Sequence, residues 1–562
     1  MNSLERMLGI SSRGFRRNRC TLDLALTLQE ALEVCRQTGE NRECHVVYLD
    51  IKAAFDSVPR QILWKRCKEK GIPKCIIDHL QTMFDHQSSV INIAGKDSQQ
   101  IIHEAGVQQG SILSPLLYAI FIDHLAETIK QSEHKVKLSD GTSFNSLLYA
   151  DDIALIAESQ EKLQQLLNIS SDHSTTNLYR FNVKKCATTS TQNLYLYGDK
   201  IPTVDSFKYL GVDFSSNGIN TEKHISRLLE KGNNALNLLS RAGLAWYGGN
   251  AEQRVNLYLT FVRPCLEYGL PVIQLDRNQI HRLQLVQNKA LRTIFGLHAS
   301  SSVSLLHTLA KIPTMNSRYN LLKYQFQQRC MFLRDSQPLL IHRIIQNSHN
   351  RTDSYLHKLF EENPVKELAQ QLFGNKIEEG LDAKETKQLY IAFLDREKQK
   401  LVEDLESKYE GHLRLSHETS KVASFLVWSS PLEVKRENIP LHRLRTKIQH
   451  RILQWIAKGL PASRNKPCGN CNELNCSPTH ITDCANLVTK LESVLPESIT
   501  ARMHRGRYCI ESIISLVNPV LKDPEKEPIM HKLAQAITTV IRQCCHNQFN
   551  LPLLDEQEVT TT

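Results

Sequence analysis

The stretch LLYADDIALIAES spans Leu147–Ser159 and sets two aspartates, Asp151 and Asp152, side by side between two apolar runs. Each run has the length of a strand, so the stretch predicts two short strands joined by a turn at the aspartates. Adjacent carboxylates repel each other and are unfavourable to bury without a counter-charge. A single pair of aspartates is usually a polar β-turn, so a second observation is needed before the pair indicates a metal site.

A third carboxylate supplies that observation. Asp50 ends the stretch CHVVYLD, whose β-branched and aromatic residues predict a strand. Three converging carboxylates suit Mg²⁺, a hard ion that prefers oxygen ligands. Two such ions about 3.5–4 Å apart can activate a hydroxyl group and stabilise a leaving phosphate. The pattern therefore favours a magnesium site formed by Asp50, Asp151 and Asp152.

Apolar periodicity and turn residues predict three helices and two further strand segments around these motifs. The helices cover residues 21–35, 59–71 and 114–129, and the strand segments cover 194–202 and 207–214. Pro59 is expected in the first turn of its helix, with Gly71 just past the helix end. Ser114 is expected as an N-cap and Pro115 as the first helical residue after it. After about residue 220 the pattern is almost wholly helical.

The composition indicates a globular chain with several domains. Its 562 residues exceed one compact core, so three or four domains or subdomains are expected. No apolar stretch reaches ~20 residues, so we expect no membrane span and no membrane partner. The net charge of +10 suggests a polyanionic partner. Part of that charge lies in a run of arginines, for which a solvated loop is the alternative: Arg13, Arg16, Arg17 and Arg19.

The cysteines indicate a reducing compartment with one exception. There are 15, an odd number, and the N-terminus has no apolar signal segment, so an intracellular protein with free thiols is expected. The exception is CGNCNELNCSPTHITDC, whose thiols and imidazole have the spacing of a structural Zn²⁺ site. The expected ligands are Cys468, Cys471, His480 and Cys484, with Cys476 as a fifth candidate. Several free thiols on a loop are the alternative.

Five motifs stand in the order of the palm motifs of a reverse transcriptase: VVYLDIKAAFDSVPR, GVQQGSILSPLLYAIFIDHL, LLYADDIALIAES, FNVKKCATT and FKYLGVDF. Together they resemble a non-LTR, LINE-type retrotransposon polymerase over roughly residues 14–214. GFRRNRCTLDLALTLQEAL resembles the preceding fingers segment, and HRLQLVQNKALRTIFGL resembles the helical region after the polymerase.

The resemblance implies an α+β right-hand polymerase, in which fingers and palm contain an antiparallel sheet and a helical thumb follows. The expected domains are fingers and palm at 1–215, thumb at 216–300, a helical C-terminal region at 301–460, a zinc element at 461–490 and a helical tail at 491–562.

The resemblance also implies roles for residues that match the family motifs. Asp50, Asp151 and Asp152 match the metal-binding aspartates, and the backbone carbonyl of Ile51 is expected as a further ligand. Phe55 matches the aromatic residue beneath the sugar of the incoming nucleotide. There it would clash with a 2′-hydroxyl and so favour deoxynucleotides. A core aromatic is the alternative role.

Two more motifs concern the nucleotide. Gln109 and Gly110 match a turn at the nucleotide site, where a glycine lets the backbone approach the substrate. The family more often has Arg-Gln-Gly-Asp here, and this chain departs from it with QQGS. Lys185 matches a lysine near the triphosphate, which could neutralise charge or protonate pyrophosphate. Lys184 is the rival for that role.

Three further residues lie near these motifs. Arg16 and Arg19 stand where the fingers would meet the triphosphate or the template. Asp56 fits a structural hydrogen-bonding role better than a catalytic one.

The function implied is RNA-directed DNA polymerisation, in which a primer 3′-hydroxyl is extended with deoxynucleoside triphosphates, as in retrotransposition. Its partners would be an RNA template and a DNA primer or target. Its cofactors would be two Mg²⁺ ions, with Mn²⁺ as a substitute, and a structural Zn²⁺. Two alternatives stay open: a nucleic-acid-binding remnant without turnover, and a protein similar to group II intron maturases.

Three expectations concern the ends of the chain and its location. Few residues precede Arg13, so an N-terminal truncation is expected. The tail after Cys484 has no strand pair that frames acidic residues, so we expect no endonuclease and a need for a supplied 3′-end. An active element of this kind would work in the nucleus.

Overall fold

The computed structural model describes most of the first three quarters of the chain. The described residues are 19–413 and Ala536, without 38–43, 86, 139–142, 192, 243–250, 296, 298–301, 332–354, 361–362 and 375. The zinc ligands expected at Cys468, Cys471, His480 and Cys484, the helical tail apart from Ala536, and Arg16 lie outside them. Predictions for those residues therefore stay predictions.

The described residues form two compact units that do not follow simple chain order. The first unit draws on Met1–Ser226, Tyr268–Leu275 and Tyr319–Asp382, and the second on Arg227–Glu267, Asp276–Arg318 and Ala383–Thr562. The domain boundaries expected at residues 215, 300 and 460 stay a prediction.

A four-stranded antiparallel sheet is the centre of the first unit. Its strands are β1 (His45–Asp50), β8 (Ser146–Tyr149), β9 (Asp152–Ala157) and β10 (Ala187–Thr188), in the order β10-β1-β9-β8. β1 pairs with β9 along its whole length, from His45 opposite Ala157 to Asp50 opposite Asp152. β8 and β9 form the expected pair of strands with the two aspartates at the turn.

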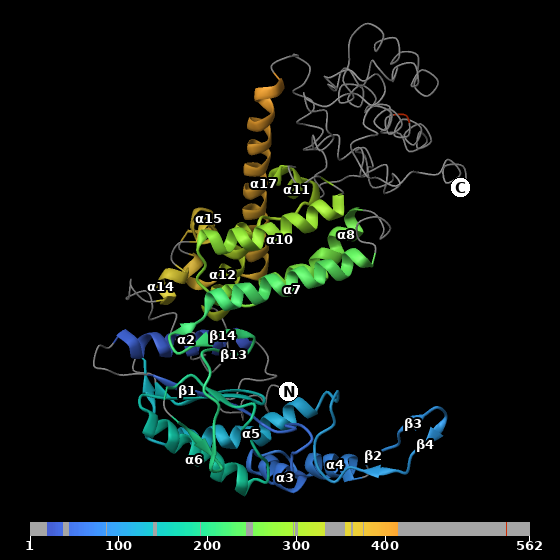
Figure 1. Ribbon diagram of the computed structural model, residues 1–562, viewed down its shortest axis with the longest axis vertical. Coiled ribbons are helices and arrows are strands. Elements are labelled where there is room, and N and C mark those ends of the chain that lie inside the picture. The colour runs from blue at the N-terminus through green and yellow to red at the C-terminus, as the bar shows by residue number, and fades with distance from the viewer. Residues whose placement is uncertain are drawn as a thin grey trace. The chain divides into compact units, whose positions relative to one another are not determined.

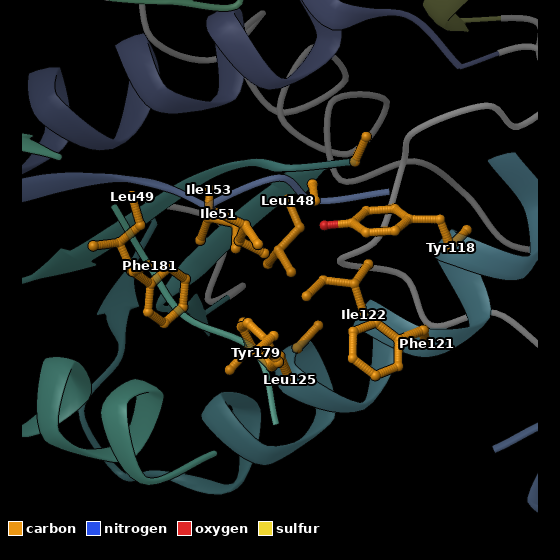
Figure 2. Packing of buried hydrophobic residues seen from close by; sticks show 14 of the residues in the cluster. Leu49, Ile51, Tyr118, Phe121, Ile122, Leu125, Leu148, Ile153, Tyr179 and Phe181 are labelled. Carbon is orange, nitrogen blue, oxygen red and sulfur yellow. The ribbon is translucent and has the colours of Figure 1, made fainter. Parts of the chain in front are cut away.

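Both faces of this sheet are buried. On one face, Val47 and Leu49 belong to a core that includes α5 (Ser114–Gln131) and α6 (Gln160–Thr176). On the other face, Val46 and Tyr48 belong to a core that includes α2 (Thr21–Gln37). Successive strand residues point to opposite faces, so a strand covered on both sides reads as a continuous apolar run. Figure 1 shows these helices around β1, and Figure 2 shows the side chains between β1 and α5.

The first unit also contains short helices and small sheets. Its other helical elements are α3 (Arg60–Glu69), α4 (Lys74–Asp85), η2 (Leu270–Val272), α14 (Tyr355–Phe360), α15 (Pro364–Phe373) and α16 (Lys376–Glu379). Its paired strands are β2 (Ser88–Ser89) with β5 (Ile101–Ile102), β3 (Asn92–Ile93) with β4 (Lys96–Asp97), β6 (Val136–Lys137) with β7 (Ser143–Phe144), and β11 (Tyr195–Leu196) with β12 (Asp199–Lys200). A three-stranded sheet contains β13 (Phe207–Tyr209), β14 (Val212–Ser215) and β15 (Gly218–Ile219).

The described part of the second unit is helical. Its elements are α8 (Ala251–Leu257), η1 (Tyr258–Val262), α9 (Arg263–Glu267), α10 (Arg277–Phe295), α11 (Val303–Ala310) and α17 (Ala383–Leu413). α7 (Thr221–Arg241) and α12 (Met315–Met331) each have residues in both units. Among described residues, every element after β15 is a helix, as the apolar pattern predicted. None of the described helices is long and apolar enough to cross a bilayer.

The two segments expected as strands each fold into a hairpin. Residues 194–202 turn at Tyr197 and Gly198, and residues 207–214 turn at Leu210 and Gly211. In each turn both residues have positive φ: 56° and 84° in the first, 47° and 79° in the second. A two-residue hairpin with this conformation matches the twist of its strands, and the glycine adopts it without strain.

Two helix starts differ from the sequence-based expectation by one residue. Ser114 is not the N-cap of α5, because it is itself helical and Leu113 holds the N-cap position without a side-chain hydrogen bond. Pro59 is the N-cap of α3 rather than a residue of its first turn. Proline has a fixed φ that suits both positions, so the sequence did not distinguish them.

None of the eight cysteines that the structure describes is in a disulfide bond. They are Cys20, Cys35, Cys44, Cys67, Cys75, Cys186, Cys265 and Cys330.

We expect both faces of β9 to support the fold. Ile153 and Ile156 are buried on opposite faces, so Ile153→Ala and Ile156→Ala should each lower the free energy of unfolding by about 2–5 kcal/mol. Ile102→Ala is the control, since Ile102 is 70% exposed and its truncation should change stability by less than about 0.5 kcal/mol. Urea denaturation measures all three. If Ile156→Ala lowers the free energy of unfolding no more than Ile102→Ala does, the side of β9 that faces α2 is not buried as described.

Candidate active site

Strand register brings the three aspartates together. Asp50 is the last residue of β1 and lies directly opposite Asp152, the first residue of β9. Directly opposed residues of an antiparallel pair have Cβ atoms about 4.5–5.5 Å apart. Asp151 lies next to Asp152, in the turn between β8 and β9. Two carboxylates far apart in sequence are thus held against each other by backbone pairing.

The neighbouring carboxylates make Asp50 and Asp152 harder to ionise. Removal from water, then the charges of Asp151 and Asp50, raise the pKa of Asp152 to about 6, while Lys208 opposes the rise. Partial burial raises the pKa of Asp50; Lys185 opposes that shift and Asp151 adds to it. Asp152 is an exposed residue by its accessible surface, so water screens part of this repulsion. The group carries more negative charge than its neighbours balance.

This donor set has the chemistry of a Mg²⁺ site. Carboxylate oxygens are the ligands that the ion prefers, and a dication would relieve their mutual repulsion. Among the described residues, no three His, Cys, Asp or Glu side chains form a closed group ready to hold a metal. Asp50, Asp151 and Asp152 are therefore close neighbours that would adjust their side chains on binding.

Backbone strain flanks the aspartates. Ala150 directly precedes Asp151 with φ 54°, and Ala53 follows three residues after Asp50 with φ 47°. A residue with a Cβ is uncommon in this left-handed region. Such conformations tend to gather at functional sites, where the surrounding structure enforces them.

The loop that carries Phe55 is fixed to the loop that carries Gln109 and Gly110. The N–H of Val107 donates to the carbonyl of Phe55 over 2.9 Å, and the N–H of Gly106 donates to the carbonyl of Val58 over 2.8 Å. The amide of Gln109 donates to the two carboxylate oxygens of Asp56 over 3.2 and 3.3 Å. The structure thereby holds Gln109 beside the segment that follows Asp50. Asp56 accepts this hydrogen bond from Gln109, which is a contact of the structural kind that we expected for it from the sequence.

Gly106 and Gly110 of this loop are required for different structural reasons. A Cβ on Gly106 would lie 2.8 Å from the backbone oxygen of Asp56, so the loops can approach this closely only without one. Gly110 has a φ of +87° and no described atom within 4 Å of where a Cβ would lie. Gly110 is therefore required by its conformation, and the space beside it is open.

Arg60 anchors the same loop and was missed in the sequence. Its buried guanidinium donates to the carbonyls of Gly106 over 3.2 Å and Phe84 over 2.6 Å, and to Gln87 over 3.2 Å. An arginine at the start of an amphipathic helix reads as a solvated residue. Nothing in the neighbouring sequence distinguished the buried Arg60 from a solvated arginine.

Lys185 lies near Asp50, with its Nζ 3.9 Å from Oδ2 of Asp50. The N–H of Asn182 donates to the carbonyl of Asp50 over 2.8 Å, and the N–H of Lys185 donates to the carbonyl of Asn182 over 2.9 Å. Lys184 is also exposed. Lys208 of β13 is a further basic residue whose charge acts on Asp152, and no motif indicated it.

Two remaining candidates are described. Ile51 has a buried side chain and forms an isolated β-bridge with Phe181. Arg19 is half-buried just before α2. The roles expected for both stay predictions.

Comparison with known proteins identifies the domain that contains this site. Residues 2–214 match the family model described as reverse transcriptase (RNA-dependent DNA polymerase). The chain is 30% identical over 193 residues to the Pol polyprotein of the type-2 retrotransposable element R2DM of Drosophila melanogaster, covering 32% of this chain and 18% of that protein. It is 24% identical over 319 residues to the RNA-directed DNA polymerase of the mobile element jockey of Drosophila melanogaster, covering 54% and 34%.

A further relative is the Pol polyprotein of the type-1 retrotransposable element R2 of Popillia japonica. It is 25% identical over 306 residues, which cover 51% of this chain and 48% of that protein. The chain spans less than half the length of each of these relatives. The matches confirm the resemblance to non-LTR retrotransposon polymerases, and residues 2–214 carry a reverse transcriptase domain.

Among solved structures, the chain is similar to telomerase of Candida albicans in complex with a fragment of telomeric RNA. The identity is 12% and the TM-score 0.33, over 67% of this chain and 54% of that chain. Apo telomerase of Candida tropicalis matches at 11% identity and a TM-score of 0.32, over 76% and 59%.

The raised pKa of Asp152 predicts how stability depends on pH without divalent metal. A carboxyl that is harder to ionise in the folded chain lowers stability as the pH rises from about 4, its ordinary pKa, through about 6. Asp152→Asn should therefore equal the parent in stability near pH 4 and exceed it at pH 7. Solvent screening of this exposed residue limits the gain to about 1 kcal/mol or less.

Urea denaturation in a metal chelator at pH 4, 5 and 7 measures this difference. Adding Mg²⁺ at pH 7 should raise the stability of the parent more than that of the variant. The same pH profile for both proteins would contradict the repulsion between the three carboxylates.

Proposed function

We propose that this chain, whose residues 2–214 carry a reverse transcriptase domain, is an RNA-directed DNA polymerase that extends a primer 3′-hydroxyl with deoxynucleoside triphosphates. One observation carries the proposal: the pairing of β1 with β9 sets Asp50 opposite Asp152, whose neighbour in the chain is Asp151. The polymerase names of the relatives support it. A cluster of repelling carboxylates at one end of a rigid sheet suits the binding of dications and phosphates.

In this proposal Asp50, Asp151 and Asp152, with the backbone carbonyl of Ile51, hold Mg²⁺ or Mn²⁺. Two bound ions would activate the primer hydroxyl and stabilise the leaving pyrophosphate. Lys185 would neutralise triphosphate charge or give pyrophosphate a proton, which its exposure and its position 3.9 Å from Asp50 support.

Nucleotide selection is assigned to the loops beside the carboxylates. Gln109 and Gly110 would contact the nucleotide, since the space beside Gly110 is open. Phe55 would lie beneath the sugar and exclude a 2′-hydroxyl. The hydrogen bond from Val107 to Phe55 supports this assignment, because it fixes the backbone of Phe55 relative to the Gln109 loop.

The proposed partners are an RNA template and a DNA primer or target, with Arg16 and Arg19 near the template or triphosphate. A structural Zn²⁺ held by Cys468, Cys471, His480 and Cys484, with Cys476 as the spare ligand, belongs to the same proposal. Retrotransposition is the process that fits the relatives' names. The nucleus is the proposed location of an active element.

The strongest alternative is a nucleic-acid-binding remnant without turnover. The three aspartates and Phe55 are all present, which favours an active enzyme. A protein similar to group II intron maturases is the other alternative, and the matches to retrotransposon polymerases favour the non-LTR assignment.

Replacing Asp151 tests the polymerase directly. Asp151→Asn keeps the side-chain shape and removes one charge from the proposed metal site. We expect primer extension on poly(rA)/oligo(dT) with Mg²⁺ to fall on the order of a hundredfold or more, since metals supply several kcal/mol of transition-state stabilisation. Asp172→Asn is the matched control, because Asp172 is an exposed carboxylate of α6 outside the loops of the proposed site. Equal rates for Asp151→Asn and the parent would refute the metal assignment, and an inert parent would favour the remnant.

Replacing Phe55 tests sugar selection. Phe55→Val opens space under the ribose, so discrimination against ribonucleotides should shrink by roughly 1–3 kcal/mol as the overlap is relieved. Steady-state incorporation of matched ribo- and deoxynucleotides measures the ratio. If that ratio stays at the parent value, Phe55 does not contact the sugar.

A further inference from the structure

The ring of Phe55 rests against a second aromatic ring. Tyr118 of α5 is fully buried, and its ring stacks on Phe55 with centroids 4.9 Å apart and planes 15° from parallel. Figure 2 shows Tyr118 reaching from α5 toward the sheet. Stacked aromatic pairs favour centroid separations of 4.5–7 Å, so this contact is a well-formed one.

The backbone of Phe55 does not determine where its ring lies. The hydrogen bond from Val107 fixes the backbone of Phe55, but the ring turns about two side-chain bonds and is only half-buried. The buried face of Tyr118 gives the ring a flat surface to lie on. The direction in which Phe55 meets a sugar therefore depends on the position of Tyr118.

Tyr118 is itself held by a row of aromatic residues. Phe121 lies 6.4 Å from Tyr118, and Tyr179 packs edge-on to Phe121 at 5.7 Å and to Phe181 at 5.6 Å. Phe181 forms a β-bridge with Ile51, the residue after Asp50. The row thus links the Phe55 ring to the strand end that carries a catalytic carboxylate, so the two are supported by the same core.

The hydroxyl of Tyr118 distinguishes it from the rest of the row. It is buried, and among the described residues it has no hydrogen-bond partner. Burial, and then the charge of Asp151, raise the pKa of this phenol. A phenylalanine would fill the same core without leaving a polar group unsatisfied. The ring of Tyr118 therefore lies within the electrostatic influence of the aspartates, next to Phe55.

We propose that Tyr118 is a positioning residue for sugar discrimination, which holds the ring of Phe55 at the angle that excludes a 2′-hydroxyl. The inference rests on the proposed polymerase function and deepens it. Tyr118 touches neither the nucleotide nor the metal ligands in this account, and acts only through Phe55.

The test compares three variants of the full chain. Tyr118→Leu removes the stacking ring, Tyr118→Phe keeps it, and Leu125→Ala truncates a fully buried residue of the same helix that is not part of the aromatic row. For each, kcat and KM are measured for one deoxynucleotide and its ribonucleotide on an RNA template with a DNA primer. Thermal denaturation shows how much each variant loosens the core.

We expect Tyr118→Leu to reduce discrimination roughly three- to tenfold, the range that a stacked pair supports. The change should come from a lower KM for the ribonucleotide, with kcat for the deoxynucleotide within about twofold of the parent. Tyr118→Phe should keep the parent's discrimination. Leu125→Ala should lower the melting temperature about as much as Tyr118→Leu and still discriminate as the parent does.

A double variant checks that the effect passes through Phe55. Adding Tyr118→Leu to Phe55→Val should not reduce discrimination further, because coupled residues are non-additive. If Tyr118→Leu does not fold, Tyr118→Met replaces it, since its longer side chain fills more of the space.

Three outcomes would overturn the inference. Unchanged discrimination in folded Tyr118→Leu would remove the role of Tyr118 while leaving the polymerase intact. Equal losses of discrimination in Tyr118→Leu and Leu125→Ala would show a general loosening of the core rather than a role of Tyr118. A parent without primer extension would refute the proposed function itself, and this inference with it.

Discussion

The pairing of β1 with β9 is the constraint on which the rest of the first unit depends. It is antiparallel and runs the full length of β1, so a shift of one residue would exchange the two buried faces of the strand. Because each face packs against a different core, neither face tolerates that exchange. The same register sets Asp50 opposite Asp152. The position of the carboxylates is thus a consequence of how the sheet is buried.

Around this fixed pair the molecule holds its less regular parts by hydrogen bonds between loops. The segment after Asp50 is joined to the Gln109 loop through Val107 and Gly106, and Arg60 anchors that loop from the side. The absence of a Cβ at Gly106 is what allows the backbones to approach. These hydrogen bonds all end on backbone carbonyl groups. They therefore fix the backbone of the segment after Asp50 relative to the Gln109 loop.

The same region gathers features that weaken a fold. Three carboxylates repel one another, Ala53 and Ala150 have left-handed backbone conformations, and the buried hydroxyl of Tyr118 has no partner among described residues. Each is unfavourable by itself. They coincide near one end of the central sheet, whose interior is mainly apolar, and such a coincidence suits a site organised for charged ligands. The two hydrophobic cores stabilise the unit and offset these unfavourable features of the site.

The sequence alone determined the features that local chemistry encodes. The strand of Asp50, the turn at Asp151 and Asp152, the apolar face of α5 and the helical character after residue 220 all followed from periodicity, turn residues and residue type. The motif order indicated a reverse transcriptase, which the family match over residues 2–214 confirmed. Periodicity and turn preference depend only on near neighbours along the chain, so they are readable without the fold.

Tertiary structure decided everything that depends on residues far apart in sequence. It set the register that opposes Asp50 to Asp152, buried Arg60, and stacked Tyr118 on Phe55. It also decided that Ser114 begins α5 rather than capping it. A buried arginine and a solvated one look alike in sequence, as do a tyrosine that fills a core and one that supports another ring. Only the packing of distant segments distinguishes them, because desolvation and contact arise when those segments meet.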